Sequence, residues 1–245
     1  GKGLITGAAR RELVGGHHDH ITSGRGHWPY AAQPTTLPPT MPSGKPWPKI
    51  SIVTPSYNQG RYIEETILSV RHQGYPNVEH IIMDGGSTDD SPDIIDRYRD
   101  GFAHAVSQKD KGQSDAINRG FKLATGDILT WLNSDDMLAE GALAAIAMAF
   151  ETSGADMVAG ECHVHREGKV ESRHLTACDH GPLPLQDLFD LDGCWLEGQF
   201  FYQPEVMFTR GIWEKAGAHV REDLYHSMDY DLWLRMANAG AKMHV

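Results

Sequence analysis

Two adjacent aspartates, Asp135 and Asp136, lie in the polar segment 133–136 that ends a predicted buried strand over residues 127–132. Like charges in a partly closed site repel each other, so either one carboxyl is protonated or a cation lies between the two. Mg²⁺ and Mn²⁺ bind carboxylate oxygens and keep coordination positions open for substrate phosphates. The pair therefore predicts a divalent cation site. The alternative is a turn whose Ser and Asp side chains cap the next helix, predicted over residues 140–150.

Two other polar segments also follow predicted strands. Residues 54–58 come after the strand 50–54, and residues 84–90 come after the strand 78–83. In open α/β sheets, ligands bind beyond the carboxyl ends of the strands, so we expect these segments to meet the aspartate pair at one crevice. The chain contains neither G-x-G-x-x-G nor G-x-x-x-x-G-K-[ST], so a dinucleotide fold and a P-loop are not indicated.

The elements that position these segments alternate between strand and helix. The β-branched run at 50–54 ends at Pro55, and the apolar spacing that follows predicts a helix closed by Gly74 and Pro76. This rhythm implies a parallel sheet in an α/β fold. The predicted strands are 50–54, 78–83, 105–107 and 127–132, and the predicted helices are 61–73, 92–98 and 114–124.

Length and charge exclude several classes of protein. The chain has 245 residues, enough to bury a core, and its longest apolar run, 142–150, is far shorter than the roughly 18 residues of a membrane span. The formal charge is −11, with +3 on residues 1–48 and −14 on residues 49–245. An acidic body argues against a nucleic-acid binder.

Residues 1–48 hold seven of the thirteen prolines and eight glycines, so we interpret them as an arm or linker with one short helix near residues 8–14. The His and Asp cluster at 17–20 lies in a Gly-flanked loop, and we interpret it as solvated linker. The three cysteines cannot all pair and none forms C-x-x-C, which favours a reducing cytoplasm. No signal peptide is recognisable at the start.

Five segments occur in the order and at the spacings of family 2 glycosyltransferases, so residues 49–245 resemble that family: I-V-T-P-S-Y-N at 52–58, M-D-G-G-S-T-D at 83–89, D-K-G-Q-S-D-A-I-N at 110–118, L-N-S-D-D at 132–136 and M-D-Y-D-L-W-L-R at 228–235. The resemblance implies a GT-A fold, which is an α/β domain with a central, mostly parallel sheet flanked by helices. It also implies a nucleotide-diphosphate-sugar donor, Mn²⁺ or Mg²⁺, and inversion at the anomeric carbon.

The resemblance assigns roles to individual residues. Residues 49–136 form the nucleotide-binding half and residues 137–245 the acceptor half. By similarity, Asp229 is the catalytic base. Nucleotide-binding residues are Thr54, Pro55, Tyr57, Asp84, Lys111 and Asp135, and the metal ligands are Asp136 and Asp135. Two positions depart from the family pattern: Gly85 replaces an acid that often contacts the base, and Met228 replaces the Glu that often precedes the catalytic Asp.

The acceptor side is predicted over residues 195–213, where aromatic residues and amides suit sugar faces and hydroxyls. Gln203 and Glu205, with Asp231, are the acceptor-site candidates, while the aromatic residues fit a plain core equally well. For the segment 229–231 the alternative is a solvated helix start. Six Cys and His residues over 162–180 suggest a zinc site, but their spacing matches no standard zinc module. Residues 156–169 are better interpreted as a strand, turn and returning strand.

The function expected from the sequence is transfer of a sugar, from UDP most often in this family, to a glycan, a lipid-linked or a protein-linked acceptor. We expect it in the cytoplasm or at the inner face of the membrane, with peripheral association; the sequence does not indicate an oligomeric state. A metal would offset the charge on the leaving diphosphate. Two alternatives remain, a sugar-phosphate nucleotidyltransferase and a catalytically silent sugar-nucleotide or glycan-binding module.

Overall fold

The computed structural model describes residues 2–6, 28–31, 36–166, 169–174, 181–183, 185–190, 192–193 and 202–245. The helix predicted near residues 8–14, the histidines at 17–20, Cys178, His180 and the aromatic pair at 200–201 lie outside the described residues.

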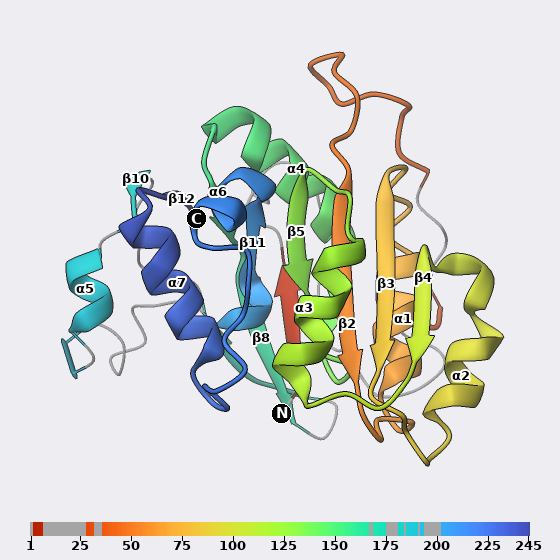
Figure 1. The fold of residues 1–245 in the computed structure, drawn as a ribbon. Coiled ribbons are helices and arrows are strands. Elements are labelled where there is room, and N and C mark those ends of the chain that lie inside the picture. The colour runs from red at the N-terminus through yellow and green to blue at the C-terminus, as the bar shows by residue number, and fades with distance from the viewer. Residues whose placement is uncertain are drawn as a thin grey trace.

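The centre of the molecule is an eight-stranded sheet in the order β10-β12-β7-β11-β5-β2-β3-β4 (Figure 1). The four strands β4, β3, β2 and β5 are parallel neighbours, and β11 runs antiparallel to both β5 and β7. The bounds are β2 Ile50–Ser56, β3 Val78–Asp84, β4 His104–Ser107, β5 Ile128–Trp131, β7 Met157–Ala159, β10 Gly181–Pro182, β11 Val206–Thr209 and β12 Lys242–His244. The expected mostly parallel α/β sheet is confirmed.

Helices cover both faces of this sheet because its central strands are apolar on both sides. Val53 of β2 packs in one core cluster with helices α3, α6 and α7, whereas Ile50 and Ile52 pack in another with α4. The helices are α1 Ile63–Arg71, α2 Ser91–Arg97, η1 Arg99–Gly101, α3 Gln113–Leu123, α4 Ala142–Ser153, α5 Leu185–Phe189, η3 Gln203–Glu205, α6 Arg210–Lys215 and α7 Met228–Asn238. None of the helices within the described ranges has the length and apolar character needed to cross a membrane.

Helix α3 lies very close to the sheet at one residue. A Cβ on Gly120 would come within 2.4 Å of Val53 Cγ1 and 3.2 Å of Met83 Cγ. Only glycine fits this approach without displacing strand side chains. The amino terminus of α3 is thereby held at the carboxyl ends of β2 and β3, where the polar segments were expected.

A second, four-stranded sheet has the order β6-β1-β8-β9, with β1 Lys2–Thr6, β6 Met137–Leu138, β8 Glu161–Arg166 and β9 Lys169–His174. The first residues of the expected arm therefore form a strand, which pairs with β6 and β8. Nearer residue 49, Met41 and Trp47 are buried at 5% exposure and pack with α4. The chain thus enters the folded body before residue 49, because apolar side chains among the prolines find a core that the segment cannot build alone.

The hairpin expected after residue 156 forms, with one difference. The single strand expected over 156–164 is split at Gly160, so that β7 belongs to the main sheet and β8 to the second one. The amide of Gly160 donates to the carbonyl of Glu205, at 2.9 Å, instead of to a neighbouring β strand. Pairing with η3 and with β1 is a tertiary effect that the local pattern does not contain.

Candidate active site

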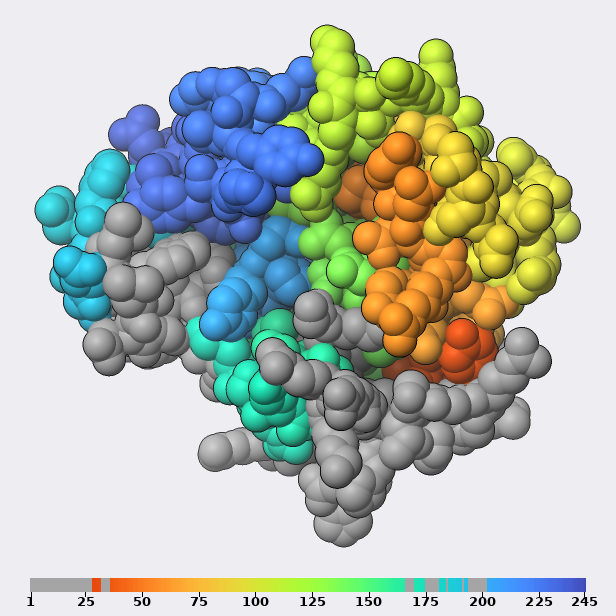
Figure 2. Space-filling model, turned by 90° about the horizontal axis from the view of Figure 1, so that it is seen from below, coloured from red at the N-terminus to blue at the C-terminus, as the bar shows by residue number. Residues whose placement is uncertain are grey.

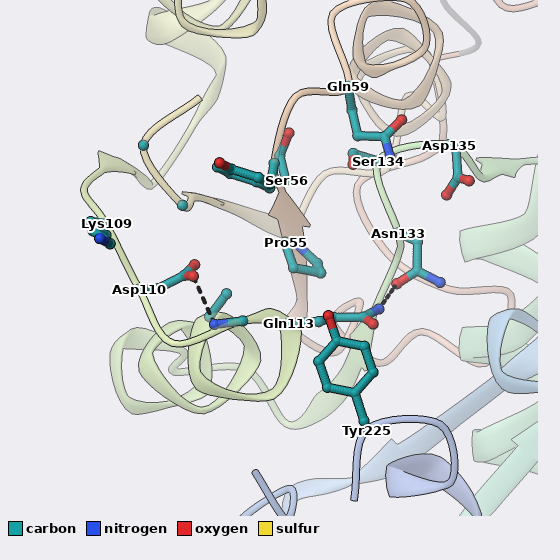
Figure 3. A pocket seen from close by; sticks show the side chains of 15 residues that line it. Pro55, Ser56, Gln59, Lys109, Asp110, Gln113, Asn133, Ser134, Asp135 and Tyr225 are labelled. Carbon is teal, nitrogen blue, oxygen red and sulfur yellow. Dashed lines mark hydrogen bonds between the residues drawn. The ribbon is translucent and has the colours of Figure 1, made fainter. Parts of the chain in front are cut away.

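A cavity of about 830 Å³ opens at the carboxyl ends of β2, β3, β4 and β5. Figure 2 views the molecule from this side and shows the hollow between the segments that follow these strands. Its described lining residues are Pro55, Ser56, Tyr57, Gln59, Gly85, Gly86, Lys109, Asp110, Gly112, Gln113, Ala116, Asn133, Ser134, Asp135 and Tyr225 (Figure 3). The three polar segments predicted to meet at one crevice all contribute residues to this cavity, and the β4–α3 segment contributes to it as well.

Of the residues predicted after β2, Pro55 and Tyr57 line the cavity and Thr54 does not. The Tyr57 ring is 62% exposed, which leaves its face available to a ligand. Thr54 is fully buried, with its hydroxyl 3.0 Å from Nε2 of His80. Burial lowers the pKa of His80 to about 3, so this ring is neutral. Thr54 therefore supports the floor of the site from inside the sheet.

Asp84 is a support for the β3–α2 segment. It is 2% exposed and accepts hydrogen bonds from the amides of Gly86 and Ser87, at 3.2 and 3.1 Å. The hydroxyls of Ser87 and Ser107 donate to it as well. Oδ2 accepts three of these hydrogen bonds and Oδ1 accepts one. The contact between Asp84 and a nucleotide base that the resemblance implied remains a prediction.

The segments after β2 and β3 are tied to each other above the cavity. The amide of Asn58 donates to the hydroxyl of Ser87, at 2.8 Å, and the side-chain oxygen of Asn58 accepts from the amide of Thr88, at 2.9 Å. Asn58 adopts a positive φ of 53°, a conformation that Asn tolerates better than most residues. The amide of Gly60 donates to Asp89, at 2.8 Å. These bonds hold Pro55 and Tyr57 in place before any ligand arrives.

The segment after β4 brings backbone and charge to the cavity. Asp110 accepts from the amide of Gly112 at 2.9 Å, and Gly112, at φ 118°, begins α3 in a conformation that favours glycine. The predicted nucleotide ligand Lys111 has an 80% exposed side chain, whose Nζ is 4.0 Å from Glu222. Its neighbours Lys109, Asp110 and Gly112 line the cavity instead.

Asn133 organises the segment that carries the aspartate pair. Its side-chain oxygen accepts from Gln113 Nε2 at 2.7 Å, as Figure 3 shows. Its side-chain nitrogen lies 3.2 Å from both Gln203 Oε1 and Asp136 Oδ2. Gln203 in turn donates to the carbonyl of Trp131, at 2.9 Å. One amide side chain thus links helix α3, the η3 turn and the acids at the end of β5.

The two aspartates face different surroundings. Asp135 lines the cavity, whereas Asp136 is 6% exposed, accepts from Asn133, and has its carbonyl bonded by the hydroxyl of Thr66 at 2.8 Å. Within the described ranges no three Asp, Glu, His or Cys side chains cluster as metal ligands. A Mg²⁺ or Mn²⁺ ion commonly takes one or two carboxylates and completes its shell with substrate phosphates and water, and a cavity-facing Asp135 beside a buried Asp136 fits that arrangement.

Asp229, the predicted base, lies in the first turn of α7. The preceding residue, Met228, accepts a hydrogen bond from the Ser114 hydroxyl, at 2.7 Å, beside cavity-lining Gln113. Burial raises the pKa of Asp229, and the amide of Tyr230 opposes this by donating to its carboxylate. Asp231, predicted at the acceptor site, pairs with Arg235 at 2.8 Å. Neither Asp229 nor Asp231 is among the described residues that line the cavity, and the role of Asp229 as the base remains a prediction.

The other acceptor candidates are buried. Gln203 is 8% exposed and belongs to the Asn133 network. Glu205 is fully buried, pairs with His174 at 3.0 Å and closes the η3 turn through the amide of Tyr202. These contacts fix the η3 turn behind the aspartate pair, and the acceptor role of Gln203, Glu205 and Asp231 remains a prediction.

The Cys and His cluster on β8 forms part of a hairpin. Alternation places His163 and His165 on one side, with ring centroids 6.4 Å apart, and the nearest acid, Glu161, lies 2.9 Å from His163. Cys162 points the other way in the pleat and is buried. The hairpin expected from the sequence is formed by β8 and β9, while Cys178 and His180 lie outside the described residues.

Residues 51–211 match the sequence profile of Glycosyl transferase family 2. The chain belongs to this family. Glycosyltransferase GlyG of Streptococcus pneumoniae is 34% identical over 121 residues, which are 48% of this chain and 40% of that protein. A Campylobacter jejuni protein described as GalNAc(5)-diNAcBac-PP-undecaprenol beta-1,3-glucosyltransferase is 30% identical over 50% of this chain and 41% of its own length.

Solved structures of the family share the fold. S. aureus TarS 1–349 in complex with UDP-GlcNAc superposes with a TM-score of 0.63 at 18% identity, over 80% of this chain and 55% of that one. At this identity the likeness establishes the GT-A type of fold and nothing finer. The chain spans less than half the length of the two curated relatives described above.

Several cavity residues were not assigned a role individually from the sequence, although the segments that carry the family resemblance contain Ser56, Asp110, Gln113 and Asn133. The residues without an individual role are Ser56, Gln59, Lys109, Asp110, Gln113, Asn133 and Tyr225. For Asp110 the signal was available, since it follows β4 by three residues at the same sheet edge as the predicted segments. Tyr225 carried no such signal, because it belongs to the loop before α7, which reaches the cavity only through tertiary packing.

Proposed function

We propose that this chain is the catalytic domain of an inverting, metal-dependent glycosyltransferase. It transfers a sugar from a nucleotide-diphosphate donor, a UDP-sugar, to a glycan or glycolipid acceptor in polysaccharide or glycoconjugate synthesis. The observation that carries the proposal is the cavity itself: four segments from neighbouring parallel strands meet there, within the part of the chain that matches the family. Ligands of open α/β sheets bind at this edge.

The lining of the cavity suits a nucleotide diphosphate. Tyr57 supplies an exposed ring beside Pro55, on which a flat base can stack. Gly85 and Gly86 bring backbone without side chains, and Gly86 has a positive φ of 83° that favours glycine. The backbone can therefore approach a ligand closely on this side of the cavity.

The charge of the cavity supports a requirement for a cation. Among the described residues that line it, Asp110 and Asp135 are acidic and Lys109 is the one basic side chain. The body around it is strongly acidic as well, at −14 over residues 49–245. A diphosphate in such a field is repelled unless a divalent ion accompanies it. We infer that Asp135 and Asp136 hold Mn²⁺ or Mg²⁺, which offsets the charge on the departing diphosphate.

Asp229 is the proposed general base. Burial raises the pKa of Asp229, and a carboxylate with a raised pKa is a stronger base than one with the ordinary value. It would take the proton from the acceptor hydroxyl as that oxygen attacks the anomeric carbon from the face opposite the diphosphate. This direction of attack inverts the configuration.

The donor and acceptor classes rest on the relatives. TarS has been solved with UDP-GlcNAc, and the name of the Campylobacter protein describes a β-1,3-glucosyltransferase for an undecaprenol-linked saccharide. We propose by analogy a UDP-sugar donor and a saccharide acceptor, lipid-linked or free, met in the cytoplasm at the membrane surface.

A binding and turnover screen tests the proposal. Purified protein is mixed with UDP-, GDP-, dTDP- and CMP-sugars, with and without Mn²⁺, and both the melting temperature and nucleotide release are measured. We expect a Mn²⁺-dependent rise in melting temperature with UDP-sugars, slow UDP release, and loss of both after EDTA or in Asp135→Ala and Asp136→Ala. Release of pyrophosphate from a nucleoside triphosphate and a sugar phosphate would support a nucleotidyltransferase instead. Binding of a sugar nucleotide without any turnover in the presence of acceptors would support the catalytically silent binding module.

A further inference from the structure

We propose that Asp110 recognises the base of the donor, by accepting the ring N3–H of uracil on its carboxylate. The inference rests on the proposed function, since it concerns the nucleotide in the same cavity. In this chain the acidic residue that binds the base would follow β4. The position after β3, where the family often has an acid that contacts the base, is occupied by Gly85. Asp110 would then determine which nucleotide is accepted.

The first argument is the space that Asp110 fills. A Cβ on Gly85 would lie 2.8 Å from Asp110 Oδ2 and 3.1 Å from Asp110 Cγ. The carboxylate of Asp110 therefore occupies the room that a side chain at position 85 would take. Because both residues line the cavity, an acidic group is present at this point of the wall although residue 85 has no side chain.

The second argument is the hydrogen-bonding capacity of the two nearby acids. Asp84 already accepts from two amides and two hydroxyls and is 2% exposed. Asp110 uses only Oδ1, which accepts from the amide of Gly112 at 2.9 Å, and its Oδ2 has no further hydrogen bond within the described residues. The carboxylate oxygen without a described hydrogen bond at this wall is therefore Oδ2 of Asp110.

The third argument is a buried hydroxyl that lacks a partner. Ser56 is 5% exposed and lines the cavity, yet its Oγ makes no hydrogen bond to any described residue. Its carbonyl accepts from the amide of Gly85 at 2.8 Å, so Ser56 lies directly beside the same wall. Buried hydroxyls are normally satisfied, and a site built for a ligand is one place where a hydroxyl waits for its partner.

The chemistry of the base fits these two groups. Uracil presents N3–H between two carbonyl oxygens, so a carboxylate accepts from N3 and a serine hydroxyl donates to a neighbouring carbonyl. Cytosine presents an unprotonated N3, whose lone pair would face the carboxylate. A site built to hydrogen-bond a ligand N–H discriminates strongly against an analogue without it, because the buried polar group is left unpaired.

The test is a two-by-two comparison of variants and nucleotides. Binding of UDP and CDP is measured by calorimetry in Mn²⁺ for the wild type and Asp110→Asn. Asparagine keeps an oxygen for the Gly112 amide and adds an NH₂ that can donate to cytosine N3. We expect UDP affinity to fall about tenfold or more, as for the loss of a hydrogen bond to a charged group, CDP affinity to hold or rise, and the preference for UDP to collapse.

A matched control removes the same charge from a neighbouring residue. Asp115 lies on the adjacent turn, accepts from the Lys111 amide at 3.2 Å and pairs with Arg119, but does not line the cavity. Asp115→Asn should leave the ratio of UDP to CDP affinities unchanged. An equal change of the ratio in both variants would mean that general charge, and not recognition by Asp110, sets the preference, and would overturn the proposal.

Ser56→Ala provides an independent readout. Because its hydroxyl has no protein partner, the melting temperature of the free protein should stay the same or rise, while UDP affinity falls about threefold to tenfold. If the wild type binds no nucleotide at all, the proposed function fails. If the wild type binds UDP and Asp110→Asn keeps the full preference for UDP over CDP, the proposed function stands and the assignment of Asp110 is wrong.

Discussion

The two ends of the same parallel strands are built in opposite ways. At the amino-terminal edge, Glu79 accepts from Lys49 Nζ at 2.7 Å, from the Ser51 hydroxyl, and from both the amide and the hydroxyl of Thr125. At the carboxyl-terminal edge, the Ser56 hydroxyl has no hydrogen-bond partner among the described residues, and Oδ2 of Asp110 has none either. One edge is closed by its own hydrogen bonds, and the other keeps donors and acceptors for a ligand.

This difference separates stability from function within one sheet. The amino-terminal edge is held by further bonds, because Arg210 donates to the carbonyls of Gly126 and Ala124, at 2.9 and 3.0 Å. The carboxyl-terminal edge holds a cavity of about 830 Å³ at the ends of the same strands. Substitutions at the first edge should therefore change the free energy of unfolding, and substitutions at the second should change binding and turnover.

The largest effect is expected for Asp229→Asn. If Asp229 is the general base, the turnover number should fall about 10²- to 10⁴-fold, because that is the usual contribution of a positioned base. The melting temperature should hold or rise, since burial already disfavours the charged carboxylate. Steady-state transfer assays and thermal melts measure the two quantities. The control is Asp223→Asn, which removes an exposed charge paired with Arg221 and should keep full turnover. A turnover number in Asp229→Asn equal to that of the wild type would contradict the assignment of Asp229 as the base.

The same glycine substitution at the two edges should have opposite consequences. A Cβ on Gly126 would come within 2.7 Å of the Ser51 amide and 2.8 Å of the Lys49 carbonyl, which are backbone atoms and cannot move aside. Gly126→Ala should cost about 3 kcal/mol of unfolding free energy. At Gly85 the obstructing atoms belong to the end of the Asp110 side chain, so Gly85→Ala should cost less than about 1 kcal/mol and weaken UDP binding.

Denaturant titration and calorimetry distinguish these outcomes. If Gly85→Ala destabilised the protein as much as Gly126→Ala, the proposed difference between the two edges would be wrong, since both edges would then be equally rigid. If Gly85→Ala no longer weakened UDP binding in the background of Asp110→Asn, the effect of Gly85→Ala would be assigned to the Asp110 side chain, because the group that it displaces would already be altered.

The pH dependence of stability should also report the amino-terminal edge. Burial raises the pKa of Glu79, but hydrogen bonds from Lys49, Ser51 and Thr125 outweigh it and lower the pKa to about 2. A carboxyl with a lowered folded-state pKa stabilises the fold above its unfolded pKa, near 4.5, and this stability is lost as the pH falls towards 2.

Glu79→Gln removes this dependence. The variant should lose about 2 kcal/mol at neutral pH, because strong hydrogen bonds to the carboxylate become weaker, and its unfolding free energy should fall less between pH 4.5 and 2. Urea titrations across this range measure both effects, and nucleotide binding at pH 7 should be unchanged. A parallel pH profile in wild type and variant would show that Glu79 does not titrate in this window.

The order of elements was predictable because local signals agree there. Residues 50–54, 78–83 and 105–107 become β2, β3 and β4 within two residues, and the helices predicted at 61–73 and 114–124 become α1 and α3. The remaining strands of the sheet were not predictable. The first paired residues of the short strands β11 and β12 lie 47 and 86 residues after their partners in β7, so the local pattern of these strands carries too little information.

The candidate site was predictable to the level of segments and less so to the level of side chains. Pro55, Tyr57 and Asp135 line the cavity as expected, because the carboxyl ends of parallel strands coincide. For Asp84 the sequence does not reveal the four donors around its carboxylate, which only the fold brings together. Whether an acidic side chain binds a ligand or supports a loop depends on which hydrogen-bond donors the tertiary structure places around it.

The smallest predicted effect concerns Tyr225, at the rim of the open edge. Its side chain is 79% exposed and lines the cavity opposite Pro55, from a loop that Asn118 anchors by bonds to the Val220 amide and carbonyl, at 2.7 and 2.8 Å. Tyr225→Ala should leave the melting temperature unchanged and weaken donor binding about threefold to tenfold, the magnitude of one aromatic contact. Asn118→Ala frees the loop without touching the cavity wall, so an equal loss of affinity in that variant would mean that the rim acts through its rigid placement. A loss confined to Tyr225→Ala would assign the contact to the ring.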